Sequence, residues 1–168
     1  MKELKLIKKE NHLLNYEVMD NLHMEFIDIY NSVDINSNES IKSKAMALLV
    51  HSKNHFMKEE KLMDSAKYPR VREHKNEHNK LIAELEFFID KSVSVFGMNI
   101  LKSFYLEKLP YWFHYHLLNM DSDLTGHLKT SKLVVFDLLL PYIFYLQVWQ
   151  LFQNLHLNID VHFEKLKY

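Results

Sequence analysis

The chain has 168 residues, of which 48% are hydrophobic and 26% charged, which is typical of one globular domain. It has no cysteine, which excludes disulfides, thiolate metal sites and cysteine nucleophiles. Its formal net charge of -1 offers no basic excess for nucleic acid, and no apolar leader opens the sequence, so we expect a cytoplasmic protein without a nucleic-acid partner. The eleven histidines are the anomaly in this composition, because imidazole is the commonest metal ligand.

Apolar residues recur at three- and four-residue spacing over most of the chain, which predicts amphipathic helices. The predicted helices span residues 16–33, 41–65, 69–90 and 99–121. A polar, lysine-rich arm (1–15) precedes them, and the turns between them are short. This pattern predicts an all-α fold, an antiparallel up-down four-helix bundle over residues 16–125.

The fourth predicted helix has irregular features. Pro110 removes a backbone hydrogen bond, so we expect a kink there. Gly97 precedes the helix and Gly126 lies in the polar stretch 121–130, so both glycines fall between predicted helices. We therefore expect this helix to end near Asp121.

Residues 126–168 form a predicted C-terminal extension beyond the bundle. Its central part, 138–159, has no charged residue, yet its glutamines and asparagines make it a poor membrane span. A helix that is apolar over most of its surface is usually buried. We expect an additional apolar helical segment that packs on the bundle or mediates self-association (a homo-oligomer) through residues 133–159, without stable membrane insertion.

Two pairs of metal-binding side chains flank the break between the second and third predicted helices. His55 and Glu59 lie four residues apart on the second helix, and His74 and His78 lie four residues apart on the third. Residues at this spacing share one face of a helix. The two pairs therefore present four donors to one space between two helices, which is typical of a metal site.

The other two predicted helices contribute further donors. His23 lies on the first, and His116 lies on the fourth, followed by Asp121. Seven donors suit two octahedral ions that are bridged by the carboxylates, with one position open, and imidazole-rich sites favour iron, zinc or copper. Five residues advance about 140° around an α-helix, so Asp121 reaches the site only at a helix end or a local distortion.

These motifs, in this order, resemble the hemerythrin family in its bacterial single-domain form. The motifs are His23, HFxxEE at His55–Glu60, LM…KYP at Leu62–Pro69, HxxxH at His74–His78 and WxxxHxxxxD at Trp112–Asp121. The resemblance covers residues 16–121. It implies a di-iron centre of two non-haem iron ions, joined by an oxo or hydroxo bridge, that binds O2 reversibly.

The resemblance also assigns the ligands. It places His74, His78 and His116 on one iron, His23 and His55 on the other, and Glu59 and Asp121 as bridges between them. The iron with two histidines would keep the open position for O2. One departure from the family pattern is Leu22, which stands where glutamine commonly precedes the first ligand.

Apolar residues beside the ligands would line a dry O2 pocket. They are Phe26, Phe56, Trp112, Phe113 and Leu117. The same residues also fit an ordinary bundle core. A dry pocket slows proton entry and therefore oxidation of the metal.

Three other polar residues near the motifs are expected to stay outside the metal site. His51 lies one turn before the first ligand of the second helix and is expected to be partly exposed, although it could also be an extra ligand or contact one. His114 should face away from the site. Glu60 lies about 100° around the helix from Glu59 and is expected to be solvated.

The function favoured by these patterns is reversible O2 binding for storage, delivery or sensing, by a protein that is not an enzyme. Carboxylate-dominated di-iron bundles use Glu-x-x-His motifs, and no pair of such motifs supplies the proposed ligands here. Two alternatives remain open: a di-iron peroxidase or NO/O2-scavenging enzyme that uses the same site, and an O2 or redox sensor that acts through the C-terminal segment. Zinc or manganese occupancy is a third alternative, and the electron-transfer partner is unknown.

Overall fold

The computed structural model describes residues 6–131, so most of the predicted C-terminal extension, including 133–159, lies outside the described residues. The chain divides into two compact units, Met1–His127 and Leu128–Tyr168. The fold and the site below belong to the first unit. Among residues 6–131 there is no helix whose length and apolar character would let it cross a membrane.

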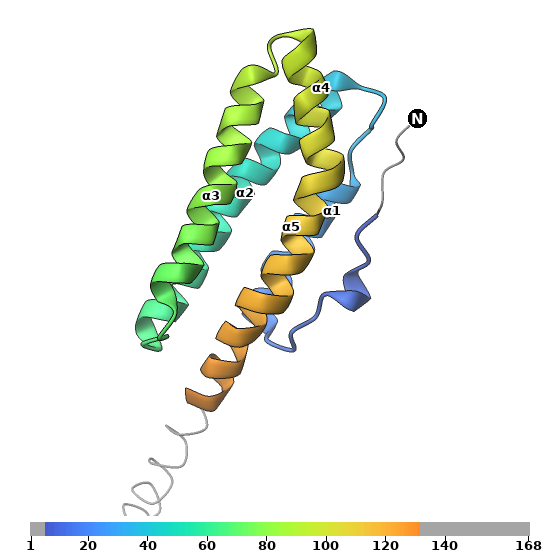
Figure 1. Cartoon of the computed structure of the whole chain (residues 1–168). Helices are drawn as coiled ribbons and strands as arrows, with labels where there is room; N and C mark the ends of the chain where they lie inside the picture. The colour runs from blue at the N-terminus through green and yellow to red at the C-terminus, as the bar shows by residue number, and fades with distance from the viewer. Residues whose placement is uncertain (1–5, 132–168) are drawn as a thin grey trace, which may run out of the picture. The chain divides into compact units, whose positions relative to one another are not determined.

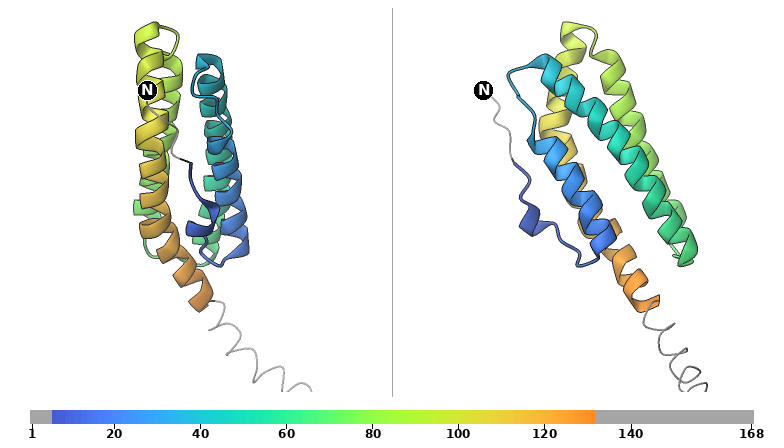
Figure 2. Two further views of the ribbon diagram at one scale, coloured as in Figure 1. Left: turned by 90° about the vertical axis from the view of Figure 1, so that its right-hand side faces the viewer. Right: turned by 180° about the vertical axis from the view of Figure 1, so that it is seen from behind.

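Four helical rods form the first unit, and Figures 1 and 2 show them side by side, with the chain reversing direction at each connection. The first three rods are α1 (Glu17–Asn31), α2 (Asn38–Ser65) and α3 (Val71–Lys91). The fourth rod is a continuous helix made of α4 (Val95–Ser103), η2 (Phe104–Lys108), α5 (Leu109–His116), η3 (Leu117–Asp121) and a further helical stretch from 122 to the end of this unit at 127. The predicted all-α four-helix bundle is confirmed.

Side-chain caps mark where two of the rods begin. The Ser37 hydroxyl accepts the amide of Ser40 at 3.1 Å at the start of α2. The Ser94 hydroxyl accepts the amide of Gly97 at 3.0 Å at the start of α4. Gly97 therefore lies in the first turn of α4 and not before the helix, and a Cβ atom there would overlap the Lys91 carbonyl group. The close approach of two backbones requires glycine at this position.

The turn between α2 and α3 is a Schellman motif. Lys67 adopts a φ of 52°, its amide donates to the Asp64 carbonyl at 3.3 Å, and the Tyr68 amide donates to the Met63 carbonyl at 2.9 Å. Tyr68 is buried, and its hydroxyl donates to Asp123 of the fourth rod at 2.6 Å. This turn sets the angle between the two helices that carry four of the seven predicted ligands.

The prediction that the fourth helix ends near Asp121 is wrong, because residues 122–131 are helical. Leu124 and Thr125 are buried there, and the His127 ring approaches the Ala66 carbonyl at 2.9 Å. These tertiary contacts outweigh the polar composition, and they outweigh the cost of about 1 kcal/mol for a glycine within a helix. Gly126 lies inside the helix, where a Cβ atom would meet no other atom within 4 Å.

The N-terminal arm is held against α1. The Ile7 backbone exchanges two hydrogen bonds with the Asn31 side chain, at 3.0 and 2.9 Å, and the Ile7 side chain is buried in the core. The carboxylate of Asp20 accepts the amides of Leu14 and Tyr16 at 2.6 and 3.0 Å. The same carboxylate thereby fixes the entry of the chain into α1.

A tyrosine pair in the main core gives a stability prediction. Tyr30 and Tyr105 stack at 5.1 Å, and Tyr105 donates to the Tyr30 carbonyl at 3.0 Å, whereas the buried Tyr30 hydroxyl has no partner among the described residues. Burial raises the pKa of Tyr30 to about 12. Tyr30→Phe should therefore raise the free energy of unfolding by about 1 kcal/mol at pH 7, because no hydroxyl is left unpaired.

The pH dependence of the same variant has a definite sign. A tyrosine whose folded pKa exceeds its unfolded value of about 10 contributes stability below pH 10 that is lost as the pH rises toward 12. Tyr30→Phe should remove this loss, so its advantage should grow by about 1 kcal/mol at pH 11. Urea unfolding at pH 7 and pH 11 measures the difference in free energy of unfolding between the variant and the parent. Tyr105→Phe is the matched control. Its free energy of unfolding should fall by about 1 kcal/mol, because it loses the hydrogen bond to the Tyr30 carbonyl. A Tyr30→Phe protein less stable than the parent at both pH values would contradict the prediction.

Candidate metal centre

Seven buried polar side chains from all four rods meet in the bundle interior. They are His23 of α1, His55 and Glu59 of α2, His74 and His78 of α3, and His116 and Asp121 of the fourth rod. None is more than 4% exposed. They are the seven residues that the sequence analysis predicted as ligands. Most of the main apolar core lies toward one end of the bundle from them.

One part of this cluster has the spacing of ligands around a single ion. Ligand atoms of Glu59, His74, His78 and His116 all lie within 4.8 Å of one another. The Nε2 atom of His116 lies 3.0 Å from that of His74 and 3.2 Å from that of His78. Nitrogen atoms about 2.1 Å from an ion, at right angles to one another, would lie about 3.0 Å apart. The spacing therefore fits a transition-metal ion.

The second part of the cluster lies on the other side of the carboxylates. The rings of His23 and His55 lie 5.3 Å apart. Asp121 directs Oδ2 toward His23 Nε2 at 3.1 Å and Oδ1 toward His74 Nε2 at 3.2 Å. Glu59 similarly lies 3.4 Å from His55 Nε2 through Oε2 and 3.1 Å from His74 Nε2 through Oε1. Each carboxylate thus faces both groups of histidines.

A π-helical segment explains how Asp121 reaches the site. Residues Leu117–Asp121 form η3, in which hydrogen bonds join residues five apart. Residues five apart then lie one above the other, as residues four apart do in an α-helix. Asp121 accordingly faces the same interior as His116, with Oδ1 3.2 Å from His116 Nε2. The local distortion that the sequence required is present, although the helix end is not.

A second π-helical segment precedes Pro110. It is η2, which spans Phe104–Lys108, and Pro110 follows in the first turn of α5. A proline ring displaces the backbone of the preceding turn, and a π segment absorbs that displacement. The kink predicted at Pro110 stays a prediction, but the helix is irregular just before it, and Phe113 and His116 are buried after it.

The electrostatics of the cluster show that its carboxylates require positive partners. Burial lowers the pKa of His74, but hydrogen bonds and charges from Asp121 and Glu59 outweigh burial and raise that pKa to about 9. Burial also raises the pKa of Asp121, yet the charge of His116 and hydrogen bonds from three histidines hold it well below its ordinary value. Burial and the neighbouring histidines lower the pKa of His78 to about 2, so His78 stays neutral.

Several buried atoms of the cluster make no hydrogen bond of good geometry among the described residues, although histidine nitrogens lie 3.1 to 3.5 Å from the carboxylates. They include His55 Nε2, both Glu59 oxygens and Asp121 Oδ1, all of which face the interior. Unpaired buried polar atoms are costly. Neutral imidazole nitrogens and carboxylate oxygens are also the donors that iron accepts. The residues present therefore fit bound metal.

Two residues beside the cluster differ from the sequence prediction. Glu60, predicted to be solvated, places Oε1 3.1 Å from His78 Nδ1. His51, predicted to be partly exposed, is buried, and its ring packs edge-on against that of His55 at 5.6 Å. Both lie beside the inner face of α2. Helical periodicity identifies the inner face but not which of its neighbours an adjacent helix will cover.

Aromatic rings pack on both groups of histidines. On the three-histidine side, Phe56 stacks on His78 at 3.8 Å and Trp112 stacks on His116 at 4.6 Å. Stacking fixes the planes of both imidazole rings. Two of the five residues predicted to line an O2 pocket therefore lie against the three-histidine group.

The other three residues of the predicted pocket lie deeper in the bundle. The edge of Phe113 packs against His23 at 5.9 Å, and Phe26 stacks on Phe113 at 4.5 Å. Leu117 is 1% exposed and belongs to the apolar core. Phe113 thus gives His23 an apolar neighbour, and Phe26 packs behind Phe113.

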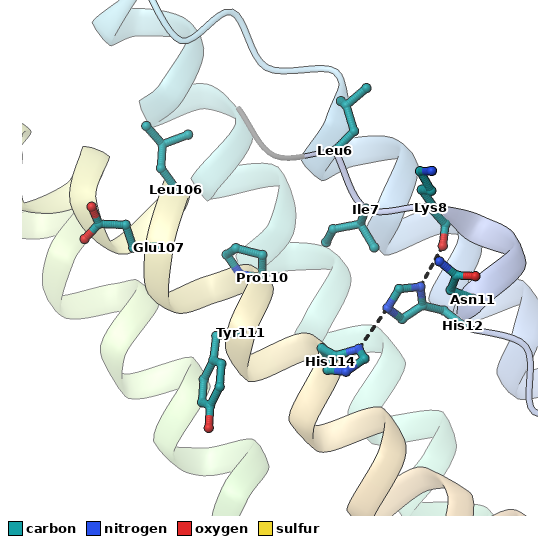
Figure 3. Close-up of a pocket in the computed structure, with 10 residues that line it drawn as sticks. All are labelled: Leu6, Ile7, Lys8, Asn11, His12, Leu106, Glu107, Pro110, Tyr111 and His114. Carbon is teal, nitrogen blue, oxygen red and sulfur yellow. Dashed lines mark hydrogen bonds between the residues drawn. The ribbon is translucent and has the colours of Figure 1, made fainter. Parts of the chain in front are cut away.

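A separate cavity of about 540 Å³ lies between the N-terminal arm and the fourth rod (Figure 3). It is lined by Leu6, Ile7, Lys8, Asn11, His12, Leu106, Glu107, Pro110, Tyr111 and His114. His12 and His114 meet there at 3.3 Å, so His114 faces away from the ligand cluster as predicted. His12 also packs on Phe113 at 5.5 Å. Phe113 thus separates this cavity from His23.

A hydrogen-bond network outside the cluster holds the fourth rod beside the α2–α3 turn. Asp123 accepts from the Tyr68 hydroxyl at 2.6 Å and from Arg70 at 3.0 Å, and Arg70 also contacts Glu73. These contacts hold the pKa of Asp123 below its ordinary value, chiefly through the Tyr68 hydrogen bond. Asp123 lies two residues after the end of the π segment, so the network anchors the helix just beyond Asp121.

Comparison with known proteins agrees with this centre. No protein-family model matches the chain, and no solved structure matches it. A curated protein, the bacteriohemerythrin of Ralstonia nicotianae (strain ATCC BAA-1114 / GMI1000), is 28% identical over 103 residues, which cover 61% of this chain and 74% of that protein. The chain is therefore similar in sequence to a bacteriohemerythrin, and its buried cluster of histidines and glutamate is compatible with a hemerythrin-like metal site.

Proposed function

We propose that the chain is a non-haem di-iron protein that binds O2 reversibly, in storage, delivery or sensing. His74, His78 and His116 would hold one iron and His23 and His55 the other, and Glu59 and Asp121 would be available to both. The observation that carries the proposal is the placement of each carboxylate between two groups of histidines, with five Nε2 atoms directed inward.

The unequal donor count supports O2 binding on one side. His23 and His55 supply two nitrogens where the other group supplies three, so an ion held beside them would have room for an exogenous ligand. Two ferrous ions, one in each group, would supply the two electrons that O2 takes up on binding. Phe113 and Phe26 exclude water next to His23, which slows proton entry and the loss of bound O2 in an oxidised form.

The absorption spectrum tests this function. Protein purified with iron and reduced anaerobically should develop a visible charge-transfer band on exposure to O2, and the band should disappear when O2 is removed. Metal analysis should give two iron ions per chain. A reduced protein that oxidises at once and turns over O2, NO or peroxide would instead support the enzyme alternative. Zinc or manganese in place of iron would contradict the proposal.

A further inference from the structure

His78 is held in one orientation by groups on three sides. Its Nδ1 lies 3.1 Å from Glu60 Oε1, while its Nε2 faces the interior, 3.2 Å from His116 Nε2. The Phe56 ring stacks on the imidazole at 3.8 Å with an interplanar angle of 2°. The two nitrogens therefore have fixed and different surroundings, one carboxylate and one metal site.

The Glu60 contact distinguishes His78 from other histidines of the cluster. In residues 6–131, the Nδ1 atoms of His23 and His74 are buried without a hydrogen-bond partner. An imidazole that donates Nδ1–H to a carboxylate has its Nε2 lone pair free for a metal, and becomes a stronger donor to it. The structure thus gives one ligand an anionic partner that these two lack.

Glu60 also connects this ligand to the protein surface. Its Oε2 lies 3.6 Å from Lys75 Nζ, and Lys75 lies 3.3 Å from Asp64. The Glu60 side chain is 29% exposed, and it lines a surface groove of about 390 Å³ together with Phe56 and His78. The charge of Glu60 is therefore shielded from solvent only in part, and Lys75 offsets some of it.

We propose that Glu60 is a positioning residue that fixes the tautomer of His78 and lowers the reduction potential of the iron that His78 holds. This inference rests on the proposed di-iron function. A negative charge behind a ligand favours the more oxidised metal, so Glu60 makes the three-histidine iron easier to oxidise. The His78–Glu60 contact is also the point at which a ligand of the site borders a surface groove.

The charge is tested with Glu60→Gln, which keeps an oxygen that can accept from Nδ1–H. Its iron content and fold should match those of the parent, while its reduction potential should rise by about 59 mV or more, which is a tenfold change in the equilibrium constant of one-electron reduction. Asp64→Asn is the matched control, because it removes a second carboxylate from Lys75 without touching His78. Spectroelectrochemical titration of the three proteins measures the potentials, and the reduction potential of Asp64→Asn should match that of the parent.

The positioning role is tested with Glu60→Met, which removes the acceptor but keeps the length of the side chain. The nitrogen chemical shifts of His78 in metal-free protein should show the Nδ1–H tautomer in the parent and lose that preference in the variant. Iron affinity, measured by competition with a chelator, should weaken by about 10- to 100-fold.

Two results would overturn the inference: an unchanged potential in Glu60→Gln, or an unchanged tautomer of His78 in Glu60→Met. Failure of the proposed function has a different signature. A parent protein that binds no iron would end the di-iron proposal, yet the tautomer measurement on metal-free protein would still decide whether Glu60 positions His78.

Discussion

Asp121→Asn should reduce the iron content from two ions per chain to one or none and abolish the reversible O2-dependent absorption band. The carboxylate uses both oxygens, Oδ2 toward His23 and Oδ1 toward His74 and His116. Asparagine has the same shape but offers one oxygen and one NH2 donor, so it can face a metal on one side only. Metal analysis and absorption spectra of the reduced protein measure the effect.

A control variant distinguishes the loss of a metal ligand from a change in the stability of the helix. Asp123→Asn is the matched control, since it removes a carboxylate two residues further along the same rod and leaves an oxygen for the Tyr68 hydroxyl. It should keep two iron ions and lose about 1 kcal/mol of stability. Circular dichroism should show an intact helical fold in both variants. An Asp121→Asn protein with two iron ions and the parent's spectrum would remove Asp121 from the site.

Most of the bundle and the cluster could be predicted from sequence because both depend on local spacing. Pairs four residues apart, His55 with Glu59 and His74 with His78, share a helix face whatever surrounds the helix. Polar turns and apolar periodicity place the rods to within a few residues. The structure brings these side chains together as expected, with His78 Nε2 3.5 Å from Glu59 Oε2.

The rest depended on contacts between segments distant in sequence. The fourth rod continues past Asp121 because Leu124 and Thr125 are buried and Asp123 binds the α2–α3 turn, which composition alone does not reveal. Likewise, Glu60 meets His78 because α3 covers that flank of α2. The π segments could be predicted only in part. The five-residue spacing from His116 required some distortion near Asp121, but no residue type specifies a π turn.

Iron binding and folding should be strongly coupled, because the site encloses two carboxylates and several unpaired atoms far from water. In metal-free protein the raised pKa of His74 keeps a positive charge next to Glu59 and Asp121, and protons are poor substitutes for metal ions. Iron at a free concentration about a thousand times its dissociation constant should stabilise the fold by about 4 kcal/mol.

Removing iron with a chelator should therefore lower the melting temperature by about 10 to 20 °C at neutral pH. Thermal unfolding followed by circular dichroism, with and without added ferrous iron under anaerobic conditions, measures the shift. The shift should become much smaller in Asp121→Asn, because that variant loses the group that joins the two metal positions. Equal melting temperatures for the iron-loaded and iron-free parent would mean that the cluster is stable without metal. In that case its unpaired carboxylate and imidazole atoms would need another partner, and the di-iron assignment would lose its physical basis.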